Sequence, residues 1–288
     1  MSKKITVIGG DSRQLYTAAC LAEKGYTVKL FGFELHTGEN SLPAADCLAD
    51  ACEADMIVLG LPCTKNGKTL FAPFSEREYD LKDILARTRP GTAIFAGMAP
   101  QQLKAAAKAA DCELFDYFDR DELTVKNALL TGEGVLSILL EKLPVTVFGL
   151  KAAVIGYGRV AYYTSRMLKA LGADVTVFAR SPEQLAKAET AGLNAVELKR
   201  FADEKRHFDC LINTVPVQIT GKEELNALNT DCLLIETASA PFGIDRDAAA
   251  DAGFTLIKAQ SLPGKTAPAT AGKIIADTID KMIREVTD

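Results

Sequence analysis

The chain has 288 residues, of which 48% are hydrophobic and 25% charged, a composition typical of a soluble globular protein. This length exceeds what a single hydrophobic core commonly serves, so we expect two α/β domains. A net charge of −5 excludes a broad basic surface of the kind that nucleic acids and anionic membranes require, so we expect neither as a partner.

The seven cysteines are odd in number and scattered through mostly apolar runs, which is typical of a protein from a reducing compartment. No apolar stretch is long enough to span a membrane, and the first residues resemble a strand rather than a signal peptide. We therefore expect a cytoplasmic protein. No cysteine or histidine grouping has the spacing of a metal site, so we expect no metal.

Short apolar runs alternate with helical stretches through both halves of the chain, which indicates parallel sheets flanked by helices. The predicted strands of the first half are residues 5–8, 28–31, 56–59, 93–95 and 114–118, and those of the second are 152–155, 175–178, 210–213, 233–236 and 255–258. A predicted helix at 126–143 ends at Pro144, and residues 271–286 have the apolar spacing of a final helix.

The pattern predicts two doubly wound parallel-sheet domains of the Rossmann-like α/β class. Residues 1–143 form a substrate or partner domain, and residues 271–288 pack back on it as a helix. Residues 144–270 form a Rossmann domain that binds NAD(P). Two such domains facing each other would leave a cleft between them.

A phosphate-binding loop follows the first strand of the second domain. Gly156 makes a tight turn, Gly158 lets the backbone approach a pyrophosphate, and Ala161 permits close packing of the next helix on the strand. A strand precedes the loop, and a helix and a second strand follow it, which is the context that the motif requires. The predicted loop contacts with the cofactor are Gly156, Gly158, Arg159, Val160 and Ala161.

The second strand of this domain ends in Ala179, Arg180 and Ser181, where an NAD enzyme commonly has Asp or Glu to bind the ribose 2′-hydroxyl. A guanidinium and a hydroxyl group suit a 2′-phosphate instead, so we predict NADP rather than NAD. In the alternative interpretation, Arg180 is an ordinary solvated charge and NAD binds through main-chain contacts.

Three further segments follow strands of the second domain or lead into it. Asn213, Thr214, Val215 and Pro216 end a strand where a loop would lie beside the nicotinamide ribose, although an ordinary turn would look the same. The loops that contain Ser239 and Lys265 follow the next two strands, and Lys265 is the best cation for an acidic substrate. Thr131 and Glu133 lie where the domains meet, although helix capping alone would explain them.

In the first domain, the turn that begins at Gly9 has no glycines in dinucleotide register, so it is not expected to bind a second nucleotide. Arg13, in the first turn of the following helix, is a candidate receptor for a carboxylate, with an exposed helix arginine as the alternative. His36 and His207 have no acidic partner in the sequence. No hydrolase or nucleotide triphosphatase motif is present.

Taken together, these segments resemble the family of dipicolinate synthase A subunits over nearly the whole chain. The resemblance is carried by residues 7–14, 127–128, 131–134, 154–161, 177–181, 239–241 and 262–268. The chain resembles a divergent member, because Leu130 stands where the family pattern favours proline.

The resemblance implies a cytoplasmic oxidoreductase of sporulation that oxidises dihydrodipicolinate to dipicolinate, pyridine-2,6-dicarboxylate, with NADP. It also implies that the partner is a flavoprotein-like B subunit of dipicolinate synthase, and we expect a homo-oligomer. Arg13, Thr131, Ser239 and Lys265 would bind the dicarboxylate, Lys265 also acting in catalysis, and Glu133 would accept the proton, with water or His207 as alternatives. Two other functions stay open: another two-domain NAD(P)-dependent dehydrogenase of a 2-hydroxy or amino acid, or a non-catalytic protein that binds NADP within a complex.

Overall fold

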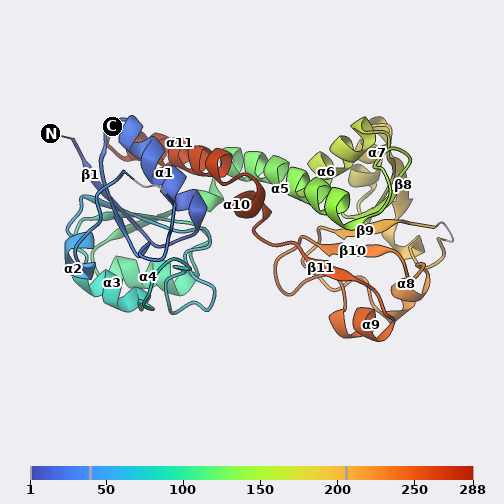
Figure 1. The fold of residues 1–288 in the computed structure, drawn as a ribbon, viewed down its shortest axis with the longest axis horizontal. Coiled ribbons are helices and arrows are strands. Elements are labelled where there is room, and N and C mark those ends of the chain that lie inside the picture. The colour runs from blue at the N-terminus through green and yellow to red at the C-terminus, as the bar shows by residue number, and fades with distance from the viewer. Residues whose placement is uncertain (1, 39–40, 205–206, 288) are drawn as a thin grey trace. The chain divides into compact units, whose positions relative to one another are not determined.

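The computed structural model describes residues 2–38, 41–204 and 207–287. The chain divides into two compact units, unit 1 from Met1–Asn127 with Ala267–Asp288 and unit 2 from Ala128–Thr266 (Figure 1). Each unit is a parallel sheet with helices on both faces, so the predicted fold class is confirmed. The division falls inside one long helix, α5 (Asp121–Lys142), whereas the sequence places the domain boundary at residues 143 and 144, which stays a prediction.

Unit 1 contains a five-stranded parallel sheet in the order β2-β1-β3-β4-β5, the order of flavodoxin-like doubly wound sheets. Its elements are β1 (Lys4–Ile8), α1 (Ser12–Glu23), β2 (Thr27–Phe31), α2 (Leu48–Ala51), β3 (Met56–Leu59), α3 (Leu81–Arg87), β4 (Ala93–Ala96), α4 (Gln101–Ala109), β5 (Glu113–Asp116), the 3₁₀ turn η1 (Tyr117–Asp119), the start of α5, and α11 (Pro268–Thr287).

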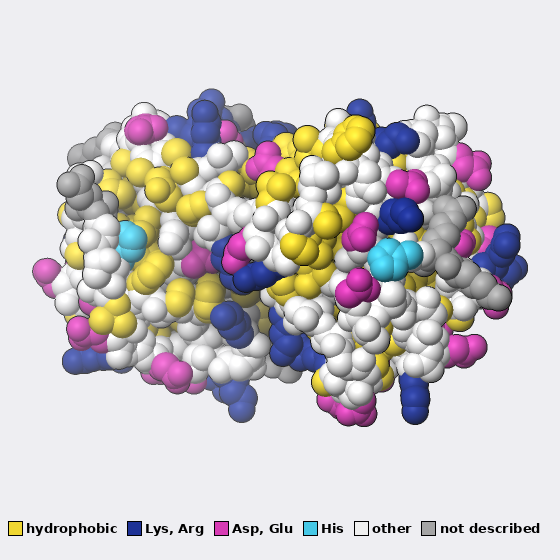
Figure 2. Space-filling view, turned by 45° about the vertical axis from the view of Figure 1, so that its right-hand side comes forward, with side chains coloured by type: hydrophobic (Ala, Val, Ile, Leu, Met, Phe, Trp, Pro, Cys, Tyr) yellow, Lys and Arg dark blue, Asp and Glu magenta, His cyan; other side chains and the backbone are white. Residues whose placement is uncertain are grey.

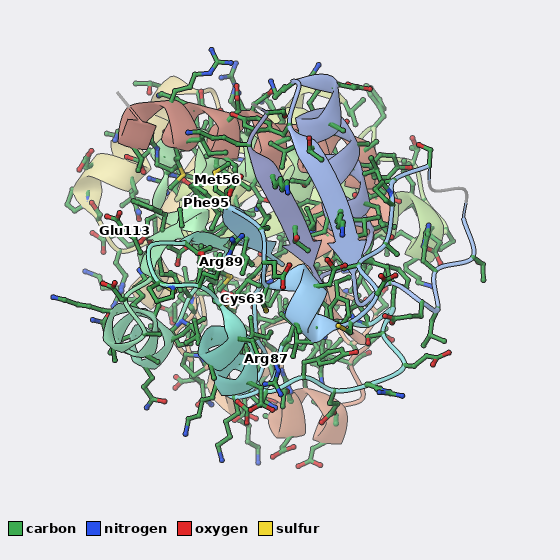
Figure 3. The ribbon with its side chains drawn as sticks, turned by 90° about the vertical axis from the view of Figure 1, so that its left-hand side faces the viewer. Met56, Cys63, Arg87, Arg89, Phe95 and Glu113 are labelled. Carbon is green, nitrogen blue, oxygen red and sulfur yellow. The ribbon has the colours of Figure 1, made fainter. Side chains whose placement is uncertain are left out.

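Alternate strand residues supply the two cores of unit 1, one on each face of the sheet. Met56 and Phe95 pack on the face that α1 and α11 cover, whereas the neighbouring Ile57 and Ile94 point to the face that α2, α3 and α4 cover. Figure 3 labels Met56 and Phe95 in the sheet and Cys63 in the loop that follows β3.

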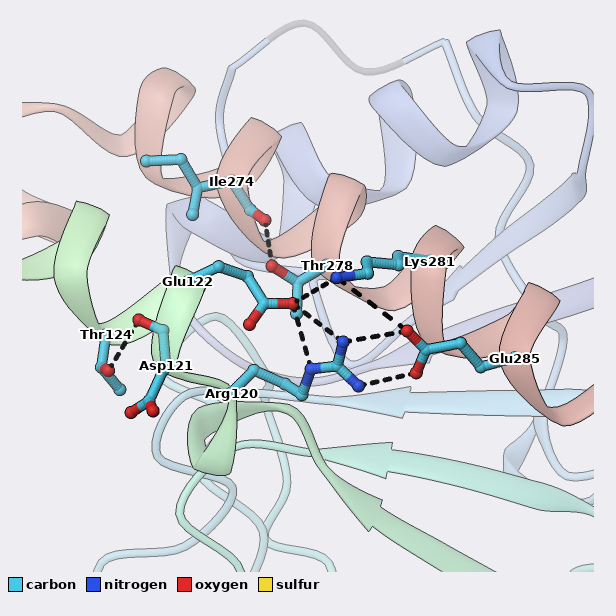
Figure 4. A network of polar contacts seen from close by, with 8 residues as sticks. All are labelled: Arg120, Asp121, Glu122, Thr124, Ile274, Thr278, Lys281 and Glu285. Atoms are coloured by element: carbon cyan, nitrogen blue, oxygen red, sulfur yellow. Dashed lines mark hydrogen bonds and ion pairs between the residues drawn. The ribbon is translucent and has the colours of Figure 1, made fainter.

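The helix α11 completes unit 1, although it follows all of unit 2 in the chain. Ile275 and Ile279 are buried against the same core as Leu21 of α1. At the other end of α11, the Arg120 guanidinium binds the Glu285 carboxylate at 2.7 and 3.0 Å (Figure 4). Together, the apolar face and the ion pair fix α11 to unit 1.

The carboxylate of Glu122 joins the same polar network. Arg120 donates to it at 2.9 and 3.1 Å, and the Lys281 ammonium lies 3.2 Å away. The hydrogen bonds from Arg120 are the main reason that the pKa of Glu122 falls to about 2. Glu122 is therefore ionised at neutral pH and links the start of α5 to α11.

Unit 2 contains a six-stranded parallel sheet in the order β11-β10-β9-β6-β7-β8. Numbered from its own first strand this is the order 3-2-1-4-5-6 of a dinucleotide-binding Rossmann sheet, read from the β8 edge. Its elements are the rest of α5, β6 (Lys151–Ile155), α6 (Arg159–Ala170), β7 (Asp174–Ala179), α7 (Pro182–Thr190), β8 (Asn194–Glu197), the 3₁₀ turn η2 (Leu198–Arg200), β9 (Cys210–Asn213), α8 (Lys222–Asn226), β10 (Leu233–Glu236), α9 (Arg246–Asp251), β11 (Leu256–Lys258) and α10 (Leu262–Thr266).

The predicted strands are present, with small shifts at their ends. The strand predicted at residues 114–118 is β5, which stops at Asp116 because Asp116 caps η1 by accepting the N–H of Phe118. The sequence missed β8, an edge strand with only Ala195 and Val196 as apolar residues, and it also missed the short α10.

Both signs of charge occur on the molecular surface. On the face drawn in Figure 2, acidic and basic side chains are interspersed with apolar ones on each unit. Among the described residues, α5 alone has the length and hydropathy to cross a membrane. Its Leu123 is buried in the core of unit 1 and its Val135 and Leu139 in that of unit 2, as in a helix of a folded core.

Candidate functional site

The phosphate loop joins β6 to α6 at the carboxyl edge of the unit 2 sheet. Gly156 has a left-handed backbone with φ of +88°, and its N–H donates to the Phe178 carbonyl at 2.8 Å. Gly158 is the N-cap of α6, and a Cβ atom at this position would meet nothing within 4 Å. The first N–H groups of α6 are therefore open to approach, and the loop fits a bound pyrophosphate.

Among the other residues of the phosphate loop, some are buried and hold the loop in place, and others are exposed. Tyr157 is 6% exposed, its ring lies edge-on to that of Tyr162, and burial raises the pKa of its hydroxyl, which stays protonated at neutral pH. Ala161 is fully buried and lets α6 lie close to the sheet. Arg159 is exposed and Val160 half-buried in the first turn of α6, next to the open N-terminus.

The end of β7 places a basic side chain where many NAD-binding domains have an acid. Ala179 is buried, Arg180 is exposed, and Ser181 is the half-buried N-cap of α7. Arg180 makes no hydrogen bond or ion pair with any residue that the structure describes. The side chain of Ser181 makes no capping hydrogen bond either. Both groups are available to a ligand phosphate.

The loop after β9 packs against the phosphate loop. A Cβ atom on Gly156 would lie 2.6 Å from Cγ2 of Val215, and the Thr214 hydroxyl donates to the Ile155 carbonyl at 2.8 Å. The strands β6 and β9 are neighbours at the point where the chain reverses its direction of winding, where doubly wound sheets bind ligands. Thr214 and Val215 are half-buried here and Pro216 is exposed.

Asn213, the last residue of β9, differs from the loop that follows it because it is completely buried. Its amide nitrogen donates to the Val215 carbonyl at 3.0 Å and to the Glu236 carboxylate at 2.7 Å, and its oxygen accepts the Val215 N–H at 3.2 Å. The side chain thus shapes the loop from within. A direct contact between Asn213 and a cofactor stays a prediction.

The loop after β10 contains the exposed Ser239. It follows Glu236, the last residue of β10, which sequence reasoning missed as a site residue. Glu236 is 1% exposed and accepts backbone N–H groups from this loop in addition to the Asn213 amide. The available signal is a charged residue at the end of an otherwise apolar strand, since an acid in such a position needs hydrogen-bond donors around it.

Lys265 and Glu133 come from two helices that touch. A Cβ atom on Gly134 of α5 would lie 2.6 Å from Cβ of Leu262 in α10, so the two helices are in close contact. The side chains of Glu133 and Lys265 are exposed, whereas Thr131 is buried. All of residues 131–134 lie in the middle of α5, so helix capping does not explain them. The glycines instead permit close helix packing.

His207 lies at the opposite edge of the same sheet. It precedes β9, at the amino ends of the strands, and its Nε2 is 3.6 Å from the Asp209 carboxylate. The phosphate loop and the loops after β9 and β10 are all at the carboxyl ends. The structure therefore does not bring His207 together with the other predicted site residues of unit 2.

Arg13 of unit 1 is 3% exposed, so the alternative interpretation of an exposed helix arginine is wrong. Its guanidinium binds both oxygens of the Asp11 carboxylate, at 2.9 and 2.8 Å, and also donates to the Leu61 carbonyl. The neighbouring turn is covered by the chain itself, because Gly10 donates its N–H to the Phe71 carbonyl at 2.7 Å. The binding of a substrate by Arg13 stays a prediction.

Comparisons with known proteins cover both units. Residues 4–118 match the family model of the N-terminal domain of the dipicolinate synthase A subunit, and residues 139–252 match that of the D-isomer specific 2-hydroxyacid dehydrogenase, NAD binding domain. The dipicolinate synthase A subunit of Bacillus subtilis (strain 168) is 33% identical over 287 residues, 98% of this chain and 96% of that protein. The chain belongs to the family of dipicolinate synthase A subunits.

Two solved structures of this family have the same fold. The structure of the family member from Bacillus halodurans has a TM-score of 0.85 at 29% identity and covers 97% of each chain. That from Bacillus subtilis has a TM-score of 0.85 at 32% identity and covers 100% of this chain and 97% of its own. The chain is thus a dehydrogenase-like protein with a nicotinamide-dinucleotide-binding domain in unit 2.

Proposed function

We propose that this protein oxidises dihydrodipicolinate to dipicolinate with NADP⁺ as hydride acceptor. Membership of the family of dipicolinate synthase A subunits supports the substrate. The observation that carries the choice of cofactor is the exposed Arg180, with Ser181 beside it, at the end of β7. There a carboxylate would repel a 2′-phosphate, whereas a guanidinium binds it.

The residues of unit 2 suggest how the cofactor would be held. The open N-terminus of α6 at Gly158 would receive the pyrophosphate, and Arg180 the 2′-phosphate. The loop after β9 would lie beside the nicotinamide half. The predicted cofactor contacts are Gly156, Gly158, Arg159, Val160, Ala161, Ala179, Arg180, Ser181, Asn213, Thr214, Val215 and Pro216.

The reaction needs little covalent help from the protein. The dihydropyridine ring loses a hydride and a proton and becomes aromatic, which supplies the driving force, and NADP⁺ held by unit 2 would supply the hydride acceptor. The protein has to orient the ring, neutralise two carboxylates and accept one proton. Lys265 and Ser239 have the exposed side chains suited to the carboxylates, and the exposed Glu133 is suited to accept the proton.

Two of the predicted substrate-binding residues, Arg13 and Thr131, are not accessible to a substrate in this conformation. Arg13 already binds Asp11, so a substrate carboxylate would have to share or displace that partner. Thr131 is buried within α5. We therefore rank Lys265 and Ser239 before Arg13 and Thr131 as substrate contacts.

The test is turnover by the purified chain supplied with NADP⁺ and enzymatically generated dihydrodipicolinate, followed by the absorbance of NADPH. Lys265→Ala should raise KM, and Glu133→Gln should lower kcat. Lys169→Ala, on α6, and Glu141→Gln, on α5, are matched controls, because both side chains are exposed and outside the proposed site. Equal effects in the controls would remove the proposed roles of Lys265 and Glu133.

The relatives are named as one of the lettered subunits of a synthase, which supports a further protein chain as partner. We propose that this partner is a flavoprotein-like B subunit, and that the present chain forms a homo-oligomer. The assay is therefore run with and without that partner. NADPH formation only in its presence would make turnover a property of the complex.

Another function is favoured by a specific match, that of residues 139–252 to the NAD-binding domain of 2-hydroxyacid dehydrogenases. A panel of 2-hydroxy and amino acids offered with NAD⁺ and NADP⁺ tests it. Reduction of the cofactor by one of these acids, with none by dihydrodipicolinate, would replace the proposed substrate. Binding of NADP⁺ without any turnover would instead leave a non-catalytic protein.

A further inference from the structure

The carboxylate of Glu236, at the carboxyl end of β10, accepts four hydrogen bonds from residues that the structure describes. One of its oxygens accepts the Asn213 amide at 2.7 Å and the Ala238 N–H at 3.0 Å. The other accepts the N–H groups of Gly243 and Ile244 at 2.8 and 2.9 Å. The carboxylate is buried and forms no ion pair with any described lysine or arginine, so hydrogen bonds from these four donors take the place of a cationic partner.

These donors come from the end of β9 and from the loop after β10. Asn213 is the last residue of β9 and its side chain bonds Val215 in the loop that follows, whereas Ala238, Gly243 and Ile244 belong to the loop after β10. The loops are also in steric contact, because a Cβ atom on Gly243 would lie 2.6 Å from the Val215 carbonyl and would collide with the Asn213 amide. The Glu236 carboxylate therefore holds the loops after β9 and β10 against the carboxyl end of β10.

The loop after β9 is the one that packs on the phosphate loop, through Val215 and Gly156. A displacement of the loop after β10 would reach that contact through Asn213, whose amide bonds both the Val215 carbonyl and Glu236. Within the described ranges, Arg180, where the 2′-phosphate of the adenosine half would bind, makes no hydrogen bond with Glu236 or Asn213, and neither does Gly158 at the proposed pyrophosphate position. The two halves of a bound dinucleotide should thus depend on Glu236 to different extents.

We propose that Glu236 is a positioning residue of the cofactor site, which holds the loops after β9 and β10 rigid for the nicotinamide half of NADP. The inference rests on the proposed function. Glu236 acts through Asn213 and the two loops and does not touch the cofactor itself. Its buried charge provides a preorganised platform, so binding of the nicotinamide half does not have to order these loops.

The experiment compares Glu236→Gln with wild type in calorimetric titrations with NADP⁺ and with 2′,5′-ADP, which contains the adenine half and the 2′-phosphate. Glutamine keeps the volume of the side chain but turns an NH₂ group toward backbone donors. We expect the Kd for NADP⁺ to rise about tenfold or more, as for lost hydrogen bonds to a charged group. The Kd for 2′,5′-ADP should stay within twofold.

The matched control is Asp209→Asn, which removes a carboxylate that accepts a backbone N–H, from Lys151 at 2.7 Å, at the opposite edge of the same sheet. It should leave the affinities for NADP⁺ and for 2′,5′-ADP unchanged. Unchanged NADP⁺ affinity in Glu236→Gln, or equal weakening of both ligands, would overturn the positioning role. Failure of wild type to bind NADP⁺ would be a failure of the proposed function instead.

Two additions keep the test decisive if Glu236→Gln does not fold. Gly243→Ala leaves the carboxylate in place but pushes the Asn213 amide away, and it should show the same split between the two ligands. Hydrogen exchange needs no ligand at all: the Gly243 and Ile244 amides should be protected in wild type. Fast exchange of both amides in folded wild type would show that Glu236 does not hold the loop, and the inference would fall.

Discussion

Replacing Arg180 with alanine should abolish a preference for NADP⁺ over NAD⁺. Charge-assisted hydrogen bonds from arginine to a phosphate contribute about 1.5–3 kcal/mol, which corresponds to roughly 10- to 150-fold in Kd. NAD⁺ has no 2′-phosphate, so its Kd should not change. Because Arg180 is exposed and has no partner among the described residues, its truncation should leave the folding free energy unchanged.

The assay is a calorimetric titration of both nucleotides at one fixed ionic strength, since salt screens an exposed pair. Arg166→Ala is the control, because Arg166 is an exposed arginine of the same unit whose guanidinium lies over the Tyr162 ring. The reasoning is refuted if Arg180→Ala weakens both nucleotides alike, or neither. It is also refuted if wild type binds NAD⁺ more tightly than NADP⁺.

Three further predictions concern stability. Gly134→Ala should lower the free energy of unfolding, measured in urea, by about 1–3 kcal/mol, because the added methyl group would overpack on Leu262. Gly132→Ala should be close to neutral, because the nearest atom to its added methyl group is 3.2 Å away. Equal losses in the two variants would contradict this packing. Ile279→Ala should cost about 2–5 kcal/mol, because Ile279 is fully buried in α11, and a loss below about 1 kcal/mol would show that α11 is not held by its apolar face. Since the pKa of Glu122 is about 2 in the folded protein, below its ordinary 4.5, its contribution is complete above pH 4.5 and is lost as the pH falls toward 2. Acid titration of Glu122→Gln should lack that part of the wild-type decline, at most about 1 kcal/mol because the pair is partly exposed.

The strands could be predicted from sequence wherever an apolar run is buried on both faces. Residues 56–59 and 233–235 are such runs, and both became interior strands. The edge strands β2, β5 and β11 could be predicted as well, because each contains an apolar run. β8 was missed because its only apolar residues are Ala195 and Val196, and the other two are polar and exposed.

In the candidate site, features formed by consecutive residues could be predicted from the sequence, whereas contacts between distant residues could not. The phosphate loop is a contiguous motif, so its geometry at Gly156 and Gly158 could be predicted. The hydrogen bond between Asn213 and Glu236 joins residues far apart in the chain, and only the fold brings them together. The sequence predicts that Arg13 binds a carboxylate, and the carboxylate that it binds in the structure is that of Asp11, only two residues away along the chain.

Residues 131–134 look like a possible helix end in the sequence, but they lie inside a helix. A hydroxyl, an acid and two glycines suggest a helix end, because glycine is unfavourable inside helices. Here the glycines are in the middle of α5, where Gly132 faces Thr164 and Gly134 faces Leu262. The need for small residues depends on helices that approach from elsewhere in the chain, which no local pattern reveals.

The placement of α11 has a consequence for the order in which the protein is made. A ribosome releases the chain from its amino end, so all of unit 2 emerges before residues 268–287 do. Until α11 has emerged, the face of α1 around Leu21 has no helix packed on it, and part of the apolar core of unit 1 is exposed to water. Unit 2 can finish folding first, although it comes second in the sequence, and a chain cut short before Ile275 would leave unit 1 prone to aggregation.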